Sequence, residues 1–146
     1  MVREAEKGDL QGVLELYTQL HGESFSNIGE GLLAVWDKIL NDKAHHVIVA
    51  EEGGEIVSSC VCVIIPNLTH GQRSYAVIEN VVTDEKRRCK GYATECLDYA
   101  REIALAEGCY KMMLMTGSKK ESTLHFYEQA GYNRADKTAF VQWLRG

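Results

Sequence analysis

The spacing of apolar residues near the start of the chain predicts two helices. Leucine, valine and tyrosine recur at the i, i+3, i+4, i+7 spacing of a helix face after Asp9, a residue that can cap a helix start. Gly22 follows the last of them and is typical of a helix end. A second helical repeat runs from about Gly29 to Leu40. We therefore expect two amphipathic helices, preceded by a short edge strand from Val2 to Ala5.

The middle of the chain changes to the composition of β-strands. Three segments are rich in β-branched residues, namely His46 to Glu51, Glu55 to Ile65 and Ser74 to Thr83. Gly53-Gly54 separates the first two and is typical of a tight hairpin turn. These features predict an antiparallel meander of three strands.

The last third returns to alternating helices and strands. Apolar positions from Gly91 to Glu107 predict a long amphipathic helix, and Lys111 to Thr116 predicts a short buried strand. The string Ser118-Lys119-Lys120-Glu121 matches a capping box and opens a helix that would run to about Ala130. Lys137 to Leu144 is expected to form a final strand. The predicted order is β-α-α-β-β-β-α-β-α-β, a mixed α/β fold in which the strand–helix–strand unit from Ser74 to Thr116 is parallel.

Length and charge narrow the class of protein. The 146 residues, 45% of them hydrophobic and 25% charged, are typical of one globular domain, which we expect to span residues 1–146. The net charge of -5 argues against a nucleic-acid partner, because such proteins usually carry a basic face. We expect no membrane partner, because no stretch has the length of an apolar span. Five cysteines without a C-x-x-C pair favour a reduced, cytoplasmic protein and no metal site.

One segment of the chain carries chemistry. Lys86, Arg87, Arg88 and Lys90 are four cations within five residues, between a predicted strand and a helix that begins at Gly91. The start of a helix offers unpaired N–H groups and a partial positive charge, and a glycine lets an anion approach the backbone. The segment therefore predicts a phosphate site, although a solvated basic turn is the alternative. Neither a Walker A loop nor a G-x-G-x-x-G fingerprint is present.

These residues resemble a known family. Arg88-Cys89-Lys90-Gly91-Tyr92-Ala93 is similar to [QR]-x-x-G-x-[GA], the coenzyme A pyrophosphate loop of the GNAT (Gcn5-related) N-acetyltransferases. Phe126-Tyr127-Glu128-Gln129-Ala130-Gly131-Tyr132 looks like the F-Y-x-x-x-G-F signature of that family. Ile78 to Val82 and Cys109 to Lys111 look most like its glucosamine-phosphate branch. The resemblance covers nearly the whole chain, because the predicted element order is also that of the family.

The resemblance implies an acetyl-CoA-dependent N-acetyltransferase in which a primary amine of a small molecule attacks the thioester directly. It implies that Glu79 is the general base, directly or through a water, and that Tyr127 is the acid that protonates the departing thiolate. It also implies that three segments contact acetyl-CoA: the end of the strand before the loop, the loop with the start of the next helix, and the residues just before the last helix. These residues are Val81, Val82, Thr83, Arg88, Cys89, Lys90, Gly91, Tyr92, Ala93, Thr94, Ser118 and Lys120.

Alternatives stay open at this point. Glu79 can be a structural carboxylate and Tyr127 a core tyrosine. Lys120 stands where the family often has an asparagine, and Met115 to Ser118 lack the carboxylate usual in the glucosamine-phosphate branch. A non-catalytic coenzyme A sensor and a peptide or protein N-acetyltransferase are the rival functions. In this family the edge formed by the final strand often supports dimers, so a homodimer is expected.

Overall fold

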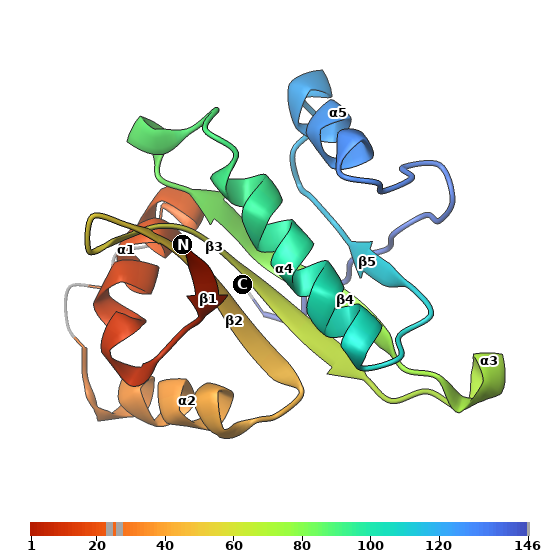
Figure 1. The fold of residues 1–146 in the computed structure, drawn as a ribbon, viewed down its shortest axis with the longest axis horizontal. Coiled ribbons are helices and arrows are strands. Elements are labelled where there is room, and N and C mark those ends of the chain that lie inside the picture. Colours follow the sequence, from red (N-terminus) through yellow and green to blue (C-terminus); the bar gives the residue numbers. More distant parts are fainter. Residues whose placement is uncertain (23–24, 26–27, 146) are drawn as a thin grey trace. The chain divides into compact units, whose positions relative to one another are not determined.

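A five-stranded mixed sheet forms the centre of the structure, a computed structural model that describes residues 1–22, 25 and 28–145 (Figure 1). The strands lie in chain order: β1 (Val2–Glu4), β2 (His45–Glu52), β3 (Glu55–Ile65), β4 (Tyr75–Thr83) and β5 (Met112–Leu114). Neighbours are antiparallel from β1 to β4, while β5 is parallel to β4. The predicted meander and the parallel strand–helix–strand unit are therefore confirmed.

The helices also follow the predicted order. They are α1 (Leu10–His21), α2 (Glu30–Asn41), the short α3 (Thr69–Gln72), α4 (Tyr92–Ala106) and α5 (Glu121–Gln129), with 3-10 turns η1 (Lys7–Asp9) and η2 (Glu85–Arg87). Gly22 ends α1 in the left-handed conformation, with φ of 69°, as its position predicted. The chain divides into two compact units, residues 1–114 and residues 115–146.

In the first unit the sheet carries helices on both faces. Val61 of β3 belongs to a core cluster with Val13 and Leu14 of α1 and Trp36 of α2. Side chains alternate between faces along a strand, so Cys60 lies on the other face, where its thiol donates to the Cys96 carbonyl of α4. Both faces of β3 are thus buried, which explains the apolar run from Cys60 to Ile65.

Cysteines pack into this core rather than serve as reactive thiols. Cys60, Cys62 and Cys96 are fully buried, and burial raises the pKa of the Cys62 thiol to about 12 and that of Cys96 to about 11. Cys60 and Cys62 therefore act as packing residues of β3. Cys89 is different, because it is exposed in the basic turn.

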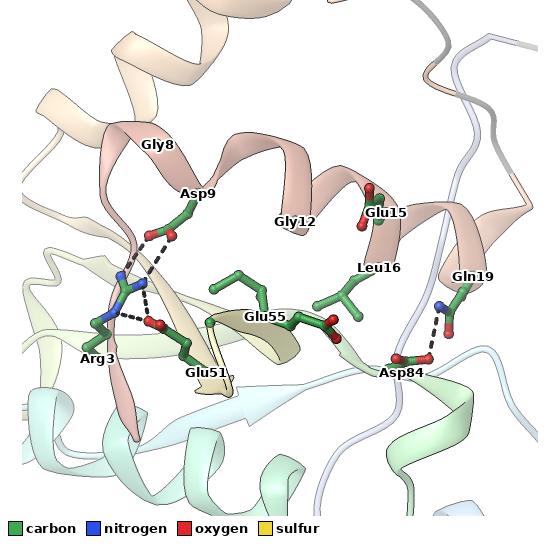
Figure 2. Close-up of a pocket in the computed structure, with 12 residues that line it drawn as sticks. Arg3, Gly8, Asp9, Gly12, Glu15, Leu16, Gln19, Glu51, Glu55 and Asp84 are labelled. Carbon is green, nitrogen blue, oxygen red and sulfur yellow. Dashed lines mark hydrogen bonds and ion pairs between the residues drawn. The ribbon is translucent and has the colours of Figure 1, made fainter.

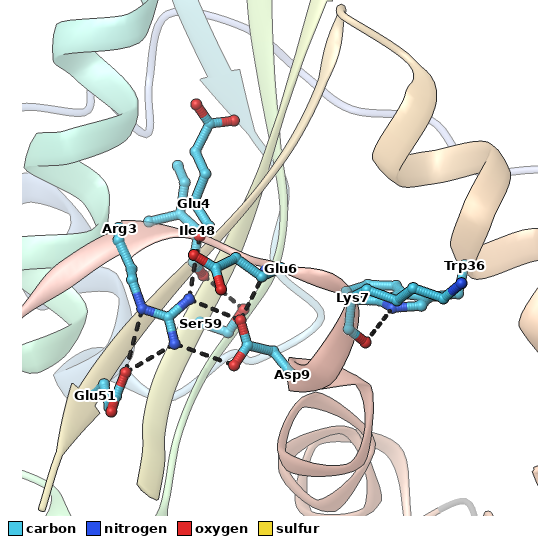
Figure 3. Close-up of polar contacts among 9 residues, drawn as sticks. All are labelled: Arg3, Glu4, Glu6, Lys7, Asp9, Trp36, Ile48, Glu51 and Ser59. Carbon is cyan, nitrogen blue, oxygen red and sulfur yellow. Dashed lines mark hydrogen bonds and ion pairs between the residues drawn. The ribbon is translucent and has the colours of Figure 1, made fainter. Parts of the chain in front are cut away.

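Polar contacts hold the N-terminal segment against the sheet (Figure 3). Arg3 forms ion pairs of 2.7 Å with both Asp9 and Glu51, joining β1, η1 and β2. The Trp36 indole donates to the Lys7 carbonyl at 3.1 Å, which positions α2 next to η1. Trp36 is buried, so it packs in the core instead of facing a cleft.

The second unit contains α5 and the segment after it, and it corrects two predictions. Arg134 forms ion pairs with Glu121 and Glu128 of α5, which fastens the following turn to the helix. The predicted capping box is wrong: Lys120 is the N-cap, and the Ser118 hydroxyl instead accepts from the Lys120 N–H at 3.3 Å. The predicted end of the helix near Ala130 is confirmed, because Ala130 is the C-cap of α5 and Gly131 follows it with φ of 103°.

The predicted final strand from Lys137 to Leu144 is also wrong. These residues have no regular secondary structure, and Phe140 and Trp143 are 90% and 86% exposed. A strand needs a neighbour for its backbone N–H and C=O groups, and no pairing is recorded for these residues, so an apolar sequence alone does not produce one. The fold class itself is confirmed as a mixed α/β fold.

None of the helices formed by residues 1–22, 25 and 28–145 has the length and apolarity needed to cross a membrane. In the same ranges no group of three or more His, Cys, Asp or Glu side chains is arranged to hold a metal ion.

Candidate active site

The edge of β4 is open over its second half. Strand β5 pairs only with Ala76, Val77 and Ile78, whereas β4 continues to Thr83. The backbone from Glu79 to Thr83 therefore has no strand partner on that side among the described residues. An open edge of this kind can hydrogen-bond to an extended ligand as though it were an added strand.

A bulge interrupts β4 at the start of this open edge. Glu79 pairs with Val61 of β3, and Val82 pairs with Ser59. Between these two pairs β4 has two residues and β3 has one, so the extra residue of the bulge belongs to β4. Asn80 lies in the bulge with φ of 51°, in the left-handed region that asparagine tolerates better than most residues. The bulge changes the local direction of the chain next to Glu79, the predicted base, whose side chain is exposed.

Beyond the bulge, contacts with β3 fix the end of β4. The fully buried Ser58 donates to the Val82 carbonyl at 3.0 Å, and its hydroxyl lies 2.8 Å from that of Thr83. The Asp84 N–H donates to the Val57 carbonyl at 2.9 Å. Since Val82 and Asp84 direct backbone groups at β3, the N–H and C=O of Thr83 face the open edge. The predicted role of Thr83 in coenzyme binding is compatible with this orientation.

The chain then turns into α4 through the predicted phosphate loop. Cys89 and Gly91 both have positive φ, 64° and 86°, and Gly91 is the N-cap of α4 without a side-chain cap. Where consecutive residues alternate between right-handed and left-handed backbone conformations, their N–H groups converge on a concave site that binds anions. Lys90 is exposed beside them. The loop therefore has backbone donors, a helix dipole and a cation, which suit a pyrophosphate.

The turn between β2 and β3 supports this loop. Arg87 donates to Glu55 at 2.9 Å, and the Tyr92 hydroxyl donates to Glu52 in a short hydrogen bond. That bond is the main cause of the lowered pKa of Glu52 and of the raised pKa of Tyr92. Arg87 is thus ion-paired with the hairpin, leaving Arg88, Lys90 and Lys86 as the exposed cations of the loop.

The remaining predicted site residues belong to the second unit. Tyr127 lies on α5, where its ring contacts those of Phe126 and Tyr132 edge to face. Ser118 precedes α5, and its hydroxyl lies 3.2 Å from that of Thr123. The structure therefore brings together Glu79 and the coenzyme residues 81–83 and 88–94 in the first unit. The second unit, residues 115–146, contains Tyr127, Ser118 and Lys120.

A pocket of about 390 Å³ lies elsewhere in the first unit, between α1 and the β2–β3 turn (Figure 2). None of the predicted site residues lines it. Its wall carries five carboxylates against the single cation Arg3: Asp9, Glu15, Glu51, Glu55 and Asp84. Such a wall repels phosphates, so electrostatics favour the loop, and not this pocket, as the candidate phosphate site.

Sequence reasoning missed three contributors to this geometry. Glu52 and Ser58 act through contacts with residues 40 and 25 positions away, and no local pattern signals such pairs. The third contributor is the bulge at Asn80, which no local periodicity predicts. A polar Asn80 within a β-branched strand was the available signal for the bulge.

Comparisons with known proteins agree with this geometry. A model of the acetyltransferase (GNAT) family matches residues 10–132. A glucosamine 6-phosphate N-acetyltransferase of Trypanosoma brucei brucei is 34% identical over 84 residues, which span 58% of this chain and 55% of the relative. The chain belongs to the GNAT acetyltransferase family.

Solved structures extend the likeness to the whole fold. An Agrobacterium tumefaciens protein assigned as an acetyltransferase has a TM-score of 0.91 and 36% identity, over 98% of this chain and 99% of its own. Glucosamine-6-phosphate N-acetyltransferase of Arabidopsis thaliana has a TM-score of 0.86 over 99% of this chain and 98% of its own. At 21% identity, the latter shows the shared fold alone.

Proposed function

We propose that this protein transfers an acetyl group from acetyl-CoA to the primary amine of a small molecule. One observation carries the proposal: the edge from Glu79 to Thr83, which has no strand partner among the described residues, is followed through η2 by the start of α4 at Gly91, which has no side-chain cap. An extended pantetheine arm would pair with the first, and the pyrophosphate attached to it would reach the second. Few ligands combine a chain of amides with a pyrophosphate at one end.

The binding roles follow from the donors and charges of each segment. Backbone groups of Val81 and Thr83 would hydrogen-bond to the amides of the arm, and Val82, whose backbone groups face β3, would contact the arm without pairing with it. The N–H groups from Cys89 to Thr94 would hold the pyrophosphate, and Lys90 would neutralise part of its charge. Ser118 and Lys120 are proposed to contact the phosphate or ribose end. A backbone N–H at the end of β4 would stabilise the oxyanion that develops on the thioester carbonyl.

The chemical step is acyl transfer to nitrogen. Glu79 removes a proton from the substrate ammonium, and the neutral amine attacks the thioester carbonyl. The new N–C bond forms, the C–S bond breaks, and Tyr127 donates its hydroxyl proton to the departing thiolate. The nitrogen loses its surplus proton, which returns to the Tyr127 oxygen directly or through water, and Glu79 releases its proton to solvent. Most of the acceleration comes from holding two reactants together, to which acid–base help of this kind typically adds ~10²–10⁴-fold.

The acceptor we expect first is an amino sugar phosphate. The support is the Trypanosoma brucei brucei relative, which is named for glucosamine 6-phosphate, and its 34% identity over 84 residues. The carboxylate usual in that branch is absent from Met115 to Ser118, so simple amines and aminoglycosides belong in the same acceptor panel.

A thiol-release assay with acetyl-CoA and this amine panel tests the proposal, with acetyl-CoA affinity measured separately by calorimetry. We expect tight coenzyme binding and acceptor-dependent release of coenzyme A. Binding without release on any amine or peptide would favour the sensor alternative, and release with peptides alone would favour a peptide N-acetyltransferase. Absence of both binding and release would refute the proposal.

Two substitutions test the assigned acid and base. Glu79→Gln should lower turnover most at neutral pH and less at high pH, where the amine loses its own proton. Tyr127→Phe should lower turnover while acetyl-CoA affinity stays the same. Unchanged turnover in either variant would remove that residue from the chemical step.

The assembly and location are also proposals. The exposed Phe140, Val141 and Trp143 of the C-terminal segment favour a homodimer, which light scattering at micromolar concentration would test; a monomer mass would contradict it. Free thiols favour a cytoplasmic protein, which cell fractionation would test.

A further inference from the structure

The turn between β2 and β3 holds both ends of the predicted phosphate loop. Glu55, the first residue of β3, accepts from Arg87 at 2.9 Å, and Arg87 ends η2 just before the loop. Glu52, the last residue of β2, accepts from the hydroxyl of Tyr92, the first residue of α4. Only Arg88 to Gly91 lie between these two anchored residues. One hairpin therefore fixes where the loop starts and where it ends.

The loop between these anchors has few contacts of its own. Cys89 and Gly91 are in the left-handed region, with φ of 64° and 86°, a conformation that is unfavourable for cysteine. Among the described residues, no backbone carbonyl accepts from the N–H groups of Cys89, Lys90 or Gly91. These donors are therefore available to an anion, and the contacts at the two ends of the loop hold them in place.

The charges beside the loop point to the same role. The Arg87 side chain is 28% exposed and ion-paired, whereas Arg88 and Lys90 are exposed. Glu52 and Glu55, by contrast, place two negative charges beside a predicted anion site, where Coulomb repulsion alone would weaken binding. Their placement is explained if the contacts that they form favour the binding conformation of the loop by more than their charges oppose the ligand.

We propose that Glu52 and Glu55 are positioning residues for the pyrophosphate of coenzyme A. Through Tyr92 and Arg87 they keep the loop in its binding conformation before the ligand arrives, so that the ligand has less of the loop to order. Neither carboxylate touches the coenzyme. The inference rests on the proposed function, because coenzyme A is the ligand expected at this loop.

Alanine and glutamine substitutions separate this role from simple repulsion. Glu52→Ala and Glu55→Ala each remove a contact, so each should weaken coenzyme A affinity about two- to fivefold in calorimetric titrations. Glu52→Gln should retain most of the affinity, because its amide oxygen still accepts from the Tyr92 hydroxyl. Repulsion alone gives the opposite result, since both kinds of substitution remove the charge and would strengthen binding equally.

Glu85→Ala is the matched control for the loss of a charge. Glu85 is an exposed residue of η2, and in the described part of the chain its carboxylate forms no hydrogen bond or ion pair. Its removal should not weaken coenzyme A binding. Stronger or unchanged binding in either Glu52→Ala or Glu55→Ala would overturn the proposal, and so would equal losses in Glu52→Ala and Glu52→Gln.

Two further measurements locate the effect in the loop. The alanine variants of Glu52 and Glu55 should bind pantetheine, which has no pyrophosphate, as wild type does; an equal loss for pantetheine and coenzyme A would overturn the proposal. In the unliganded protein, NMR order parameters of the Cys89 and Lys90 amides should fall in both alanine variants and stay at the wild-type value in Glu85→Ala. Unchanged order parameters would also overturn it. A wild-type protein that binds no coenzyme A would instead refute the proposed function.

Discussion

The substitution Gly91→Ala tests whether the start of α4 binds the coenzyme. Gly91 has φ of 86°, and a Cβ added there would meet no atom within 4 Å, so the cost of alanine is entirely one of backbone conformation. An L-residue in the left-handed region loses roughly 1–2 kcal/mol. If the loop of the unliganded variant relaxes to avoid this strain, coenzyme binding must restore the strained conformation. That cost weakens coenzyme affinity about 5- to 30-fold.

Gly108→Ala is a matched control at the other end of the same helix. Gly108 has φ of 73° and its Cβ would also meet no atom within 4 Å, so the backbone cost is similar. It lies outside the predicted coenzyme residues. The free energy of unfolding should therefore fall by a similar amount in both variants. Each loss should be smaller than the strain energy of the left-handed alanine, because alanine also restricts the unfolded chain.

Calorimetric titration with coenzyme A and urea unfolding measure the two effects. We expect weaker binding in Gly91→Ala alone, together with similar losses of unfolding free energy in the two variants. Equal coenzyme affinity in Gly91→Ala and Gly108→Ala would refute a pyrophosphate site at the start of α4.

Three further predictions concern stability. Gly12→Ala should lower the free energy of unfolding by about 1–3 kcal/mol in urea titrations, because the new Cβ would lie 2.8 Å from Cγ1 of Ile56; an unchanged midpoint would show that the helix shifts freely. The Arg3 guanidinium lowers the pKa of Asp9 in the folded protein. The ion pair therefore stabilises the fold at pH values above the unfolded carboxyl pKa of about 3.9, and this stabilisation is lost as pH falls through the folded pKa. Asp9→Asn should accordingly flatten the decline of unfolding free energy below pH ~4, and an equally steep decline would contradict it. Burial lowers the pKa of His45 from 6.5, so the unfolded state takes up the proton first and stability falls as pH drops below that value; in His45→Gln, melting curves between pH ~7.5 and ~5.5 should shift less than in wild type.

Local sequence signals predicted most elements because each signal has a local physical cause. Strand β3 spans Glu55–Ile65 as predicted, since β-branched residues and the Gly53-Gly54 turn define it without reference to the rest of the chain. Helix α1 ends at Gly22 for the same kind of reason. The segment from Lys137 to Leu144 failed because a strand depends on a partner that the segment does not itself contain.

The candidate site was predictable in its residue types but not in its shape. The strand, cations and glycine from Glu79 to Gly91 indicated a coenzyme loop, and they lie together in one unit. The sequence could not show that Arg87 is engaged by Glu55, nor that Tyr92 is held by Glu52, because those partners are 32 and 40 residues away. The bulge at Asn80 likewise depends on register with β3, which pairing and not propensity decides.

The short β5 has a consequence for the behaviour of the protein without its substrates. Unpaired strand edges are templates for association with other chains, and the stretch from Glu79 to Thr83 is such an edge. The bulge within it twists the backbone, which is one of the ways in which natural sheets discourage pairing with a second straight strand. A flexible ligand arm can follow the bent edge where a rigid neighbouring strand cannot. The distortion at Asn80 would then make the same edge receptive to a coenzyme and resistant to aggregation.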